Sequence, residues 1–166
     1  MTQTVTRDDV LRILDDVMDP EVPVLSVREL GIVRDVIVDD AGAVTVVVTP
    51  TYSGCPALRV IEEDIVAALA NAGVPNACVQ TTYAPAWTSD WIPAEAREKL
   101  RAAGIAPPAP TESGALVQLV RERAAVECPW CGSGDTEVRS EFGSTACKSL
   151  WACRACLQPF DVFKSI

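Results

Sequence analysis

The chain has 166 residues, of which 49% are hydrophobic, and its net charge at neutral pH is −9. This length and composition allow one ordinary hydrophobic core with a small additional module, and they exclude a disordered chain. Residues 1–106 carry 8 basic against 16 acidic side chains and residues 107–166 carry 6 against 7, so a nucleic-acid-binding surface is not expected.

The N-terminal sequence predicts a cytosolic protein. Asp8 and Asp9 fall where a signal peptide would need an apolar segment. The long uncharged run over residues 66–89 is interrupted by Gly73 and Pro75, so we expect no membrane span. In the cytosol, seven cysteines indicate metal or redox chemistry before disulfides.

The first predicted helix covers residues 6–18. Thr6 can cap it, and Asp9 lies at the third helical position, where a carboxylate also favours the positive end of the helix dipole. Proline at position 20 ends the helix, because the residue before a proline avoids helical dihedral angles. Ser26 and Glu29 have capping-box spacing, so residues 26–30 are expected to form a short helical turn.

Two strands are predicted next, over residues 32–38 and 43–48, with a hairpin turn between them. A second helix is expected over residues 57–72, followed by a strand over 77–83 and a further helix over 93–103. The residues predicted on the buried face of the second helix are Val60, Ile61, Ile65 and Leu69.

The predicted fold class is α/β (α+β), with a short mixed sheet and helices in a domain of residues 1–106. Residues 107–125 are expected to form a proline-rich linker and connecting segment, in which residues 115–120 are either strand or helix. Residues 126–166 are expected to form a separate metal-binding ribbon.

Two pairs of cysteines with two intervening residues predict the metal site of this ribbon. Two such tight turns, facing each other at the ends of a β-ribbon, direct four thiolates at one ion. The ligands are Cys128, Cys131, Cys153 and Cys156. We expect structural Zn²⁺, because so short a module cannot bury a sufficient core alone. Iron in a rubredoxin-like redox site and a nucleic-acid-binding ribbon are the alternatives.

Three cysteines lie outside these pairs. Cys55 precedes a proline that suits a first helical position, so we expect Cys55 to cap the second helix. There the helix dipole and free backbone amides would favour its thiolate. This is the setting of a reactive or metal-donating thiol, although a packed cysteine is the alternative. Cys147 is either a small buried residue, a substitute ligand or a transient cofactor thiol. Cys78 lies in a strand pattern and is expected to be buried.

The sequence contains no histidine, which removes histidine-based triads and the usual general base at neutral pH. The chain is therefore not expected to be catalytic alone. Asp19 and Glu21 place two carboxylates in a loop, and their spacing alone suggests caps or solvated charges. Trp87 is expected in the core or in a lid.

Several segments resemble the SufT-like domain of iron–sulfur maturation factors: residues 19–23 (Asp-Pro-Glu-Val-Pro), 30–33 (Leu-Gly-Ile-Val) and 49–56 (Thr-Pro-Thr-Tyr-Ser-Gly-Cys-Pro). Residues 86–92, 104–108 and 142–148, together with the two cysteine pairs, resemble more narrowly the D subunit family of the phenylacetyl-CoA 1,2-epoxidase system. The resemblance covers nearly the whole chain.

This resemblance implies an accessory role in phenylacetate catabolism, namely maturing or maintaining the iron–sulfur or di-iron cofactor of the epoxidase. It implies that Cys55 is the reactive cysteine, that Asp19 and Glu21 form the acidic motif of a site for transient iron or an iron–sulfur cluster, and that the four paired cysteines bind metal. The implied partners are the iron–sulfur reductase or the di-iron catalytic subunit, and a homodimer is compatible with it. A structural docking subunit without cofactor transfer and a rubredoxin-like electron carrier remain the alternatives.

Overall fold

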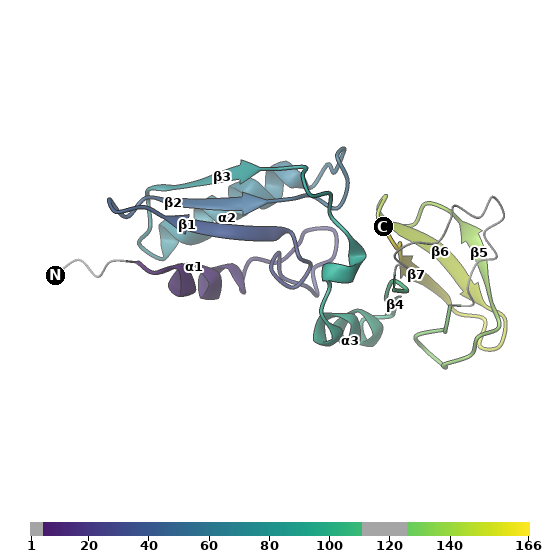
Figure 1. Ribbon diagram of the computed structural model, residues 1–166. Helices are drawn as coiled ribbons and strands as arrows, with labels where there is room; N and C mark the ends of the chain where they lie inside the picture. The colour runs from purple at the N-terminus through teal and green to yellow at the C-terminus, as the bar shows by residue number, and fades with distance from the viewer. Residues whose placement is uncertain (1–4, 111–125) are drawn as a thin grey trace. The chain divides into compact units, whose positions relative to one another are not determined.

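The structure is a computed structural model that describes residues 5–110 and 126–166 (Figure 1). The chain forms two compact units, Met1–Trp87 and Thr88–Ile166. Each unit combines helices with a small sheet, which confirms the predicted α/β class. The segment 115–120, whose type the sequence left open, lies outside the described residues.

The first unit is built on a three-stranded sheet in the order β1-β2-β3. Strands β1 (Val33–Val38) and β2 (Val44–Val48) form the predicted antiparallel hairpin. The carboxylate of Asp39 accepts hydrogen bonds from the backbone N–H groups of Ala41 and Ala43 at 2.9 and 2.8 Å, which closes the turn. Helix α2 (Leu58–Asn71) then connects β2 to β3 (Ala77–Thr81), and these two strands are parallel.

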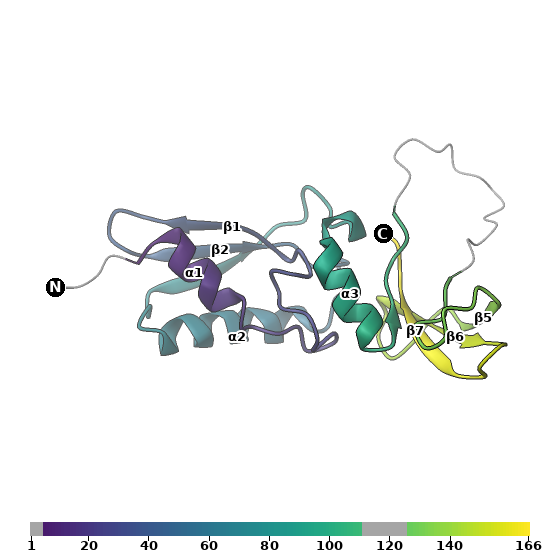
Figure 2. The same cartoon turned by 90° about the horizontal axis from the view of Figure 1, so that it is seen from below.

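Helices α1 (Arg7–Leu14) and α2 cover the same face of this sheet (Figures 1 and 2). Helix α2 turns a stripe of side chains four residues apart into the core: Ile61, Ile65 and Leu69. The prediction that Val60 is buried was wrong, because this residue lies beside that stripe and its side chain is 43% exposed.

The other sheet face is open. Cys78 lies on it, paired across the strands with Thr45, and is exposed. The prediction that Cys78 is buried was therefore wrong. The reason is that β3 is an edge strand with one face in solvent, whereas a short apolar run alone does not tell a one-sided strand from a fully buried one.

Helix α1 begins as predicted, with a reciprocal capping box between Thr6 and Asp9. It ends at Leu14, four residues before the predicted end. The following N–H groups of Asp16 and Val17 bond to carbonyls three residues back, and Met18 already pairs with Ser26 in a β-bridge. The second predicted capping box is also present, between Ser26 and Glu29.

The second unit contains a 3₁₀ turn (Ser89–Trp91), helix α3 (Ala94–Ala102) and a four-stranded sheet in the order β4-β7-β6-β5. The strands are β4 (Ile105–Ala106), β5 (Thr136–Ser140), β6 (Lys148–Cys153) and β7 (Pro159–Phe163). Their packed face forms a small core of Ala106, Cys128, Trp151, Cys153, Phe160 and Val162.

Helix α3 is bonded to the segments on either side of it, and the residue that follows its end contacts the ribbon. The guanidinium of Arg97 donates to the carbonyls of Ser89, Ile92 and Pro108 at 2.7, 3.0 and 2.5 Å. The Trp130 ring lies over Gly104, so close that a Cβ there would be 2.3 Å from the ring. Residues 88–106, which the sequence assigned to the first domain, therefore lie in the compact unit of the ribbon.

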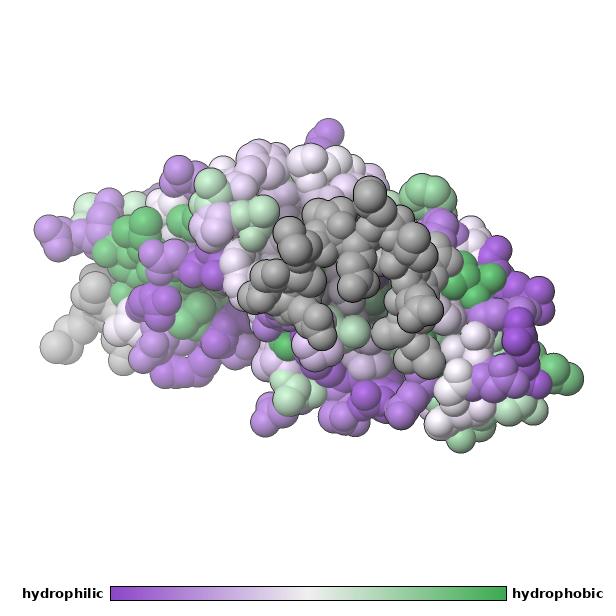
Figure 3. Space-filling model, turned by 45° about the vertical axis from the view of Figure 1, so that its right-hand side comes forward, coloured by the Kyte–Doolittle hydropathy of each residue, from purple (hydrophilic) through white to green (hydrophobic). Residues whose placement is uncertain are grey.

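None of the helices in the described ranges is long and apolar enough to cross a membrane. In the view of Figure 3 most of the described surface is hydrophilic, and hydrophobic residues form small, separate patches.

Gly104→Ala should destabilise the second unit by about 2–3 kcal/mol, because Gly104 has a φ of 78° and its missing side chain makes room for Trp130. Gly73→Ala is the matched control: its φ is 87° and nothing lies within 4 Å of the added carbon, so only backbone strain of about 1 kcal/mol is expected. Urea unfolding of both variants measures the difference. Equal losses would show that the Trp130 contact contributes nothing.

Candidate functional site

The four paired cysteines converge as the sequence predicts. Their Sγ atoms all lie within 4.8 Å of one another, with 3.7 Å between Cys128 and Cys156 and 3.6 Å between Cys131 and Cys153. A tetrahedral ion with Zn–S bonds of about 2.3 Å needs sulfurs about 3.8 Å apart. The donor set and spacing therefore fit a tetrahedral metal site.

The backbone of each cysteine turn is shaped to hold these sulfurs. The residue after the second cysteine has a left-handed conformation in both turns: Gly132 with a φ of 73° and Leu157 with a φ of 63°. The backbone N–H of Cys156 donates to the sulfur of Cys153 at 3.5 Å and lowers the pKa of this thiol to about 7. At Cys131 the backbone of Ser133 favours the thiolate, but burial and the neighbouring cysteines outweigh it and raise the pKa to about 12. The pKa of Cys156 is also raised, so metal binding must displace protons from this cluster.

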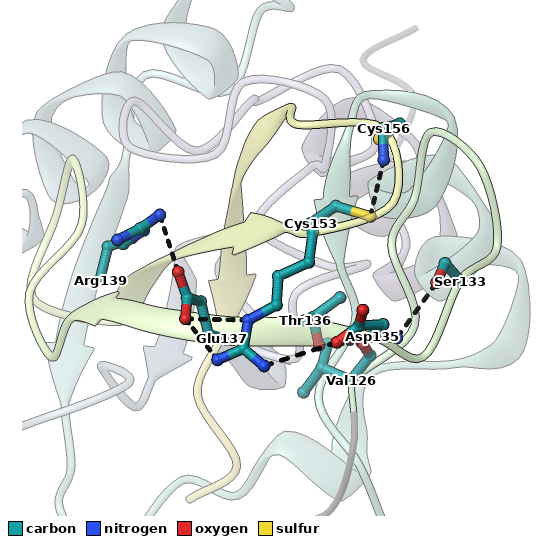
Figure 4. A network of polar contacts seen from close by, with 9 residues as sticks. Val126, Ser133, Asp135, Thr136, Glu137, Arg139, Cys153 and Cys156 are labelled. Atoms are coloured by element: carbon teal, nitrogen blue, oxygen red, sulfur yellow. Dashed lines mark hydrogen bonds and ion pairs between the residues drawn. The ribbon is translucent and has the colours of Figure 1, made fainter.

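An ion-pair network fixes the second turn to strand β5 (Figure 4). Arg154, between the two cysteines of that turn, donates to Glu137 through Nε and Nη2 at 3.0 and 2.6 Å. These bonds lower the pKa of Glu137. Arg154 also lies 3.7 Å from Asp135, which follows the first turn. The network therefore holds the two halves of the metal site in register.

Cys147 does not join this site. It is buried, with its sulfur 3.1 Å from the hydroxyl of Thr145, and among the described residues the sulfur cluster consists of the four paired cysteines alone. Of the three interpretations that the sequence allowed, the packed ribbon residue fits the structure.

Cys55 lies in the loop between β2 and α2, at the end of the first unit where this loop meets the loop of residues 15–32 (Figures 1 and 2). The prediction that Cys55 caps the helix was wrong by two positions, since Ala57 is the N-cap. The backbone amides of Ala57 and Leu58 nevertheless hydrogen-bond its sulfur and lower its pKa.

The protonation state expected for Cys55 was also wrong. Burial of the half-buried side chain raises its pKa to about 11, and the charges of Glu21 and Asp19 add to this increase. These effects outweigh the amides of Ala57 and Leu58. Without a bound cation, the resting group is a neutral thiol.

The same interaction shows that the structure brings Cys55 close to the two carboxylates named by the resemblance. Asp19 is 4% exposed, and its Oδ1 accepts hydrogen bonds from the backbone N–H groups of Glu21 and Val22 at 2.8 and 2.7 Å. These two hydrogen bonds fix the backbone position of Glu21. The three groups are neighbours, but within the described ranges they do not form a set of three ligand atoms close enough together to hold one metal ion.

Sequence reasoning missed the two threonines of this loop. Thr49 is 1% exposed, and its hydroxyl has no hydrogen-bond partner within the described structure; Thr51 is 7% exposed. Buried polar residues in an otherwise apolar strand end were the signal that could have identified them. Trp87 is a core residue, whose indole N–H donates to the carbonyl of Leu30 at 3.0 Å.

Cys128→Ser and Cys153→Ser should each release the metal and unfold the ribbon, because structural zinc contributes on the order of 10 kcal/mol to such modules. Elemental analysis and circular dichroism measure both effects, with Cys78→Ser as the control outside the cluster. One tightly bound zinc retained in both variants would contradict this ligand assignment.

Glu21→Gln should speed alkylation of Cys55 about two- to tenfold at pH 8, since removing a like charge lowers the thiol pKa and raises the thiolate fraction. In both proteins the rate should rise as the pH approaches 11. Peptide mass spectrometry resolves each cysteine. Asp64→Asn, an exposed charge change on α2, is the control and should leave the rate unchanged. An unaltered rate in Glu21→Gln would refute the coupling.

Comparison with known proteins divides the chain into two parts. Residues 7–80 match the family model of the iron-sulfur cluster assembly protein, and residues 112–164 match that of the PaaD zinc beta ribbon domain. A crystal structure of a domain of unknown function, DUF59, from Bacillus anthracis is similar with a TM-score of 0.54 at 26% identity, over 57% of this chain and 90% of that one.

Two relatives are similar in sequence. An Fe-S protein maturation auxiliary factor of Porphyromonas gingivalis is 38% identical over 57% of this chain and 90% of its own length. A protein of Escherichia coli (strain K12), named as the D subunit of a 1,2-phenylacetyl-CoA epoxidase, is 43% identical over 95% of this chain and 92% of its own length. By this near-complete match, the chain belongs to the family of 1,2-phenylacetyl-CoA epoxidase D subunits.

Proposed function

We propose that this protein is an accessory factor of phenylacetate catabolism that loads or maintains the iron cofactor of phenylacetyl-CoA epoxidase. That cofactor is an iron–sulfur cluster or a di-iron site. The observation that carries the proposal is the thiol of Cys55 beside the carboxylates of Asp19 and Glu21. This group lies in a segment that matches an iron–sulfur assembly domain, in a chain of the epoxidase D-subunit family.

The electrostatics of Cys55 suit a cation as cargo. The carboxylates of Asp19 and Glu21 disfavour the thiolate, and they favour an incoming ferrous ion for the same reason. When iron binds, the thiol proton leaves to solvent and a sulfur–iron bond replaces the S–H bond. The amides of Ala57 and Leu58 then stabilise the negative sulfur. Cargo binding is thus coupled to proton release.

The open arrangement of this group favours transfer over storage. The described residues provide one thiol and nearby carboxylates, without a preassembled cluster of three ligand atoms around Cys55. Iron held by so few protein ligands exchanges readily with a client site that offers more of them. Asp19 and Glu21 are therefore proposed as the groups that attract and steady the cargo.

The second metal has a different role in this proposal. Zn²⁺ in the site of Cys128, Cys131, Cys153 and Cys156 would cross-link the two turns of the ribbon, supply folding energy and take no part in electron transfer. The proposed client is the iron–sulfur reductase or the di-iron catalytic subunit. We propose that the protein works in the cytosol and is not catalytic by itself.

A docking subunit that transfers no cofactor is the second candidate. It is favoured by the same observation, namely that the described residues do not place three ligand atoms together around Cys55. A rubredoxin-like carrier is a third candidate, because four sulfurs at this spacing also suit iron. Visible absorption of the purified protein tests it directly, since a ferric sulfur site is coloured and zinc is not.

Elemental analysis of anaerobically purified protein tests the maturation role. Wild type should contain one zinc and labile iron, and Cys55→Ala should keep the zinc and lose the iron. Cys78→Ala, an exposed cysteine outside both sites, is the control and should match wild type. In cells, Cys55→Ala should leave the epoxidase short of iron. A fully iron-loaded, active epoxidase in those cells would refute the proposal and favour a docking subunit.

A further inference from the structure

One face of the ribbon sheet carries a groove that the metal site does not explain. It has a volume of about 420 Å³. Leu150 and Asp161, which pair across the two strands, alternate along them with the core residues Trp151 and Phe160. Strands β6 and β7 provide Leu150, Pro159, Phe160 and Asp161, and the loop of residues 142–144 forms its rim. We call this the β6–β7 groove.

The loop beside the groove is held rigidly. The N–H of Gly143 donates to the carbonyl of Lys148 at 2.8 Å, and the N–H of Lys148 returns to the carbonyl of Thr145 at 3.1 Å. The ammonium of Lys164 donates to the carbonyl of Ala146 at 2.8 Å. A loop fixed by so many bonds, with no part in either cysteine site, suits the presentation of a binding surface.

This rigid loop presents apolar side chains to solvent. Phe142 is 70% exposed, and Leu150 in the neighbouring strand is 36% exposed. Lys164 covers one face of the Phe142 ring at 4.7 Å, and the ring gains little burial within the chain. An ordered, exposed aromatic ring next to a groove is typical of a protein interaction site.

Asp161 provides the polar group of the groove. Its Oδ2 accepts a hydrogen bond from Ser144 at 2.9 Å and lies 3.8 Å from the buried ammonium of Lys148. Its Oδ1 accepts no hydrogen bond from the described part of the chain. The missing side chain of Gly143 makes room for this oxygen, because a Cβ there would lie 2.7 Å from Oδ1. The groove therefore contains a carboxylate between apolar residues, and the side chain of that carboxylate is 21% exposed.

We propose that the β6–β7 groove binds a segment of the client protein that presents an arginine. The proposal rests on the proposed function, and it assigns client recognition to the ribbon. An arginine matches both the apolar walls and the carboxylate of the groove. Its aliphatic stem packs on Leu150 and Pro159. Its planar guanidinium stacks on the free face of Phe142 while donating to Oδ1 of Asp161. The ammonium of a lysine would reach the carboxylate but would not stack on the aromatic ring.

The division of the chain into two units supports this assignment. The Porphyromonas gingivalis maturation factor is matched over 90% of its length by only 57% of this chain, and the relative named for an epoxidase is matched over 95% of it. The part that this smaller factor lacks is where a feature specific for the epoxidase client is expected.

The test compares binding of full-length variants to the purified epoxidase reductase and catalytic subunits by calorimetry. Phe142→Ala combined with Leu150→Ala should weaken binding tenfold or more, and Asp161→Asn should make the remaining binding less sensitive to salt. The matched control is Ile166→Ala, which removes an exposed apolar side chain of the same unit from outside the groove. Zinc content and alkylation of Cys55 should stay at wild-type values in all variants, which shows that each still folds.

Wild-type affinity in the double variant, or an equal loss in Ile166→Ala, would overturn the groove as the docking site and leave the maturation role intact. If wild type binds neither the reductase nor the catalytic subunit, the proposed client and the groove assignment both fail. If sedimentation shows self-association that Phe142→Ala abolishes, the groove binds a second copy of this chain, which also overturns the proposal. Loss of epoxidase iron in Cys55→Ala cells, with normal binding in that variant, separates cargo transfer from docking.

Discussion

The convergence of four sulfurs is the constraint on which the second unit depends. The small core of this unit includes two of the four ligands, Cys128 and Cys153, so the apolar packing and the metal site are the same structure. So few buried residues cannot hold a four-stranded sheet against its conformational entropy. A metal ion supplies the missing cross-link. The Trp130 contact with Gly104 then attaches α3 to the unit that the metal organises.

The first unit is held together by burial of apolar side chains, and this burial also determines the protonation state of Cys55. Its sheet is covered on one side by two helices, and the loops at the end of the sheet bury part of the thiol. Burial and two carboxylates oppose the thiolate, and two backbone amides favour it. The first group of effects is larger, so the cysteine is protonated at neutral pH. In the proposed function, it would lose its proton only when a cation binds.

The sequence predicted most of the fold because its signals were local. The capping boxes at Thr6 and Ser26 and the cysteine spacing all depend on neighbours within a few residues, and each was found as expected. The errors arose where long-range packing decides. Whether Cys78 is exposed depends on β3 being an edge strand, and the contact of Trp130 with Gly104 joins segments 26 residues apart.

The two cysteine sites show the same difference between local and long-range signals. The ligand cysteines could be read from spacing, whereas the pKa of Cys55 could not. Its position at a helix start predicted a favoured thiolate, because the helix amides are local and visible in sequence. The burial and the charges of Asp19 and Glu21 that reverse this result come from a loop more than 30 residues away. Only the family resemblance placed these carboxylates near the thiol.

In the proposed function, the ribbon site and Cys55 must not exchange ions, and the chemistry of their ligands provides a reason why they would not. Zinc binds more tightly than ferrous iron to most ligand sets, so a single open thiol would not select iron by affinity. The four-cysteine site offers four sulfurs already at tetrahedral spacing, so an ion there gains four sulfur ligands. Cys55, with a pKa of about 11, must first release a proton and gains only one sulfur ligand. In the proposed function, zinc would thus bind in the ribbon, and the Cys55 loop would stay open for a weakly held ion delivered to it.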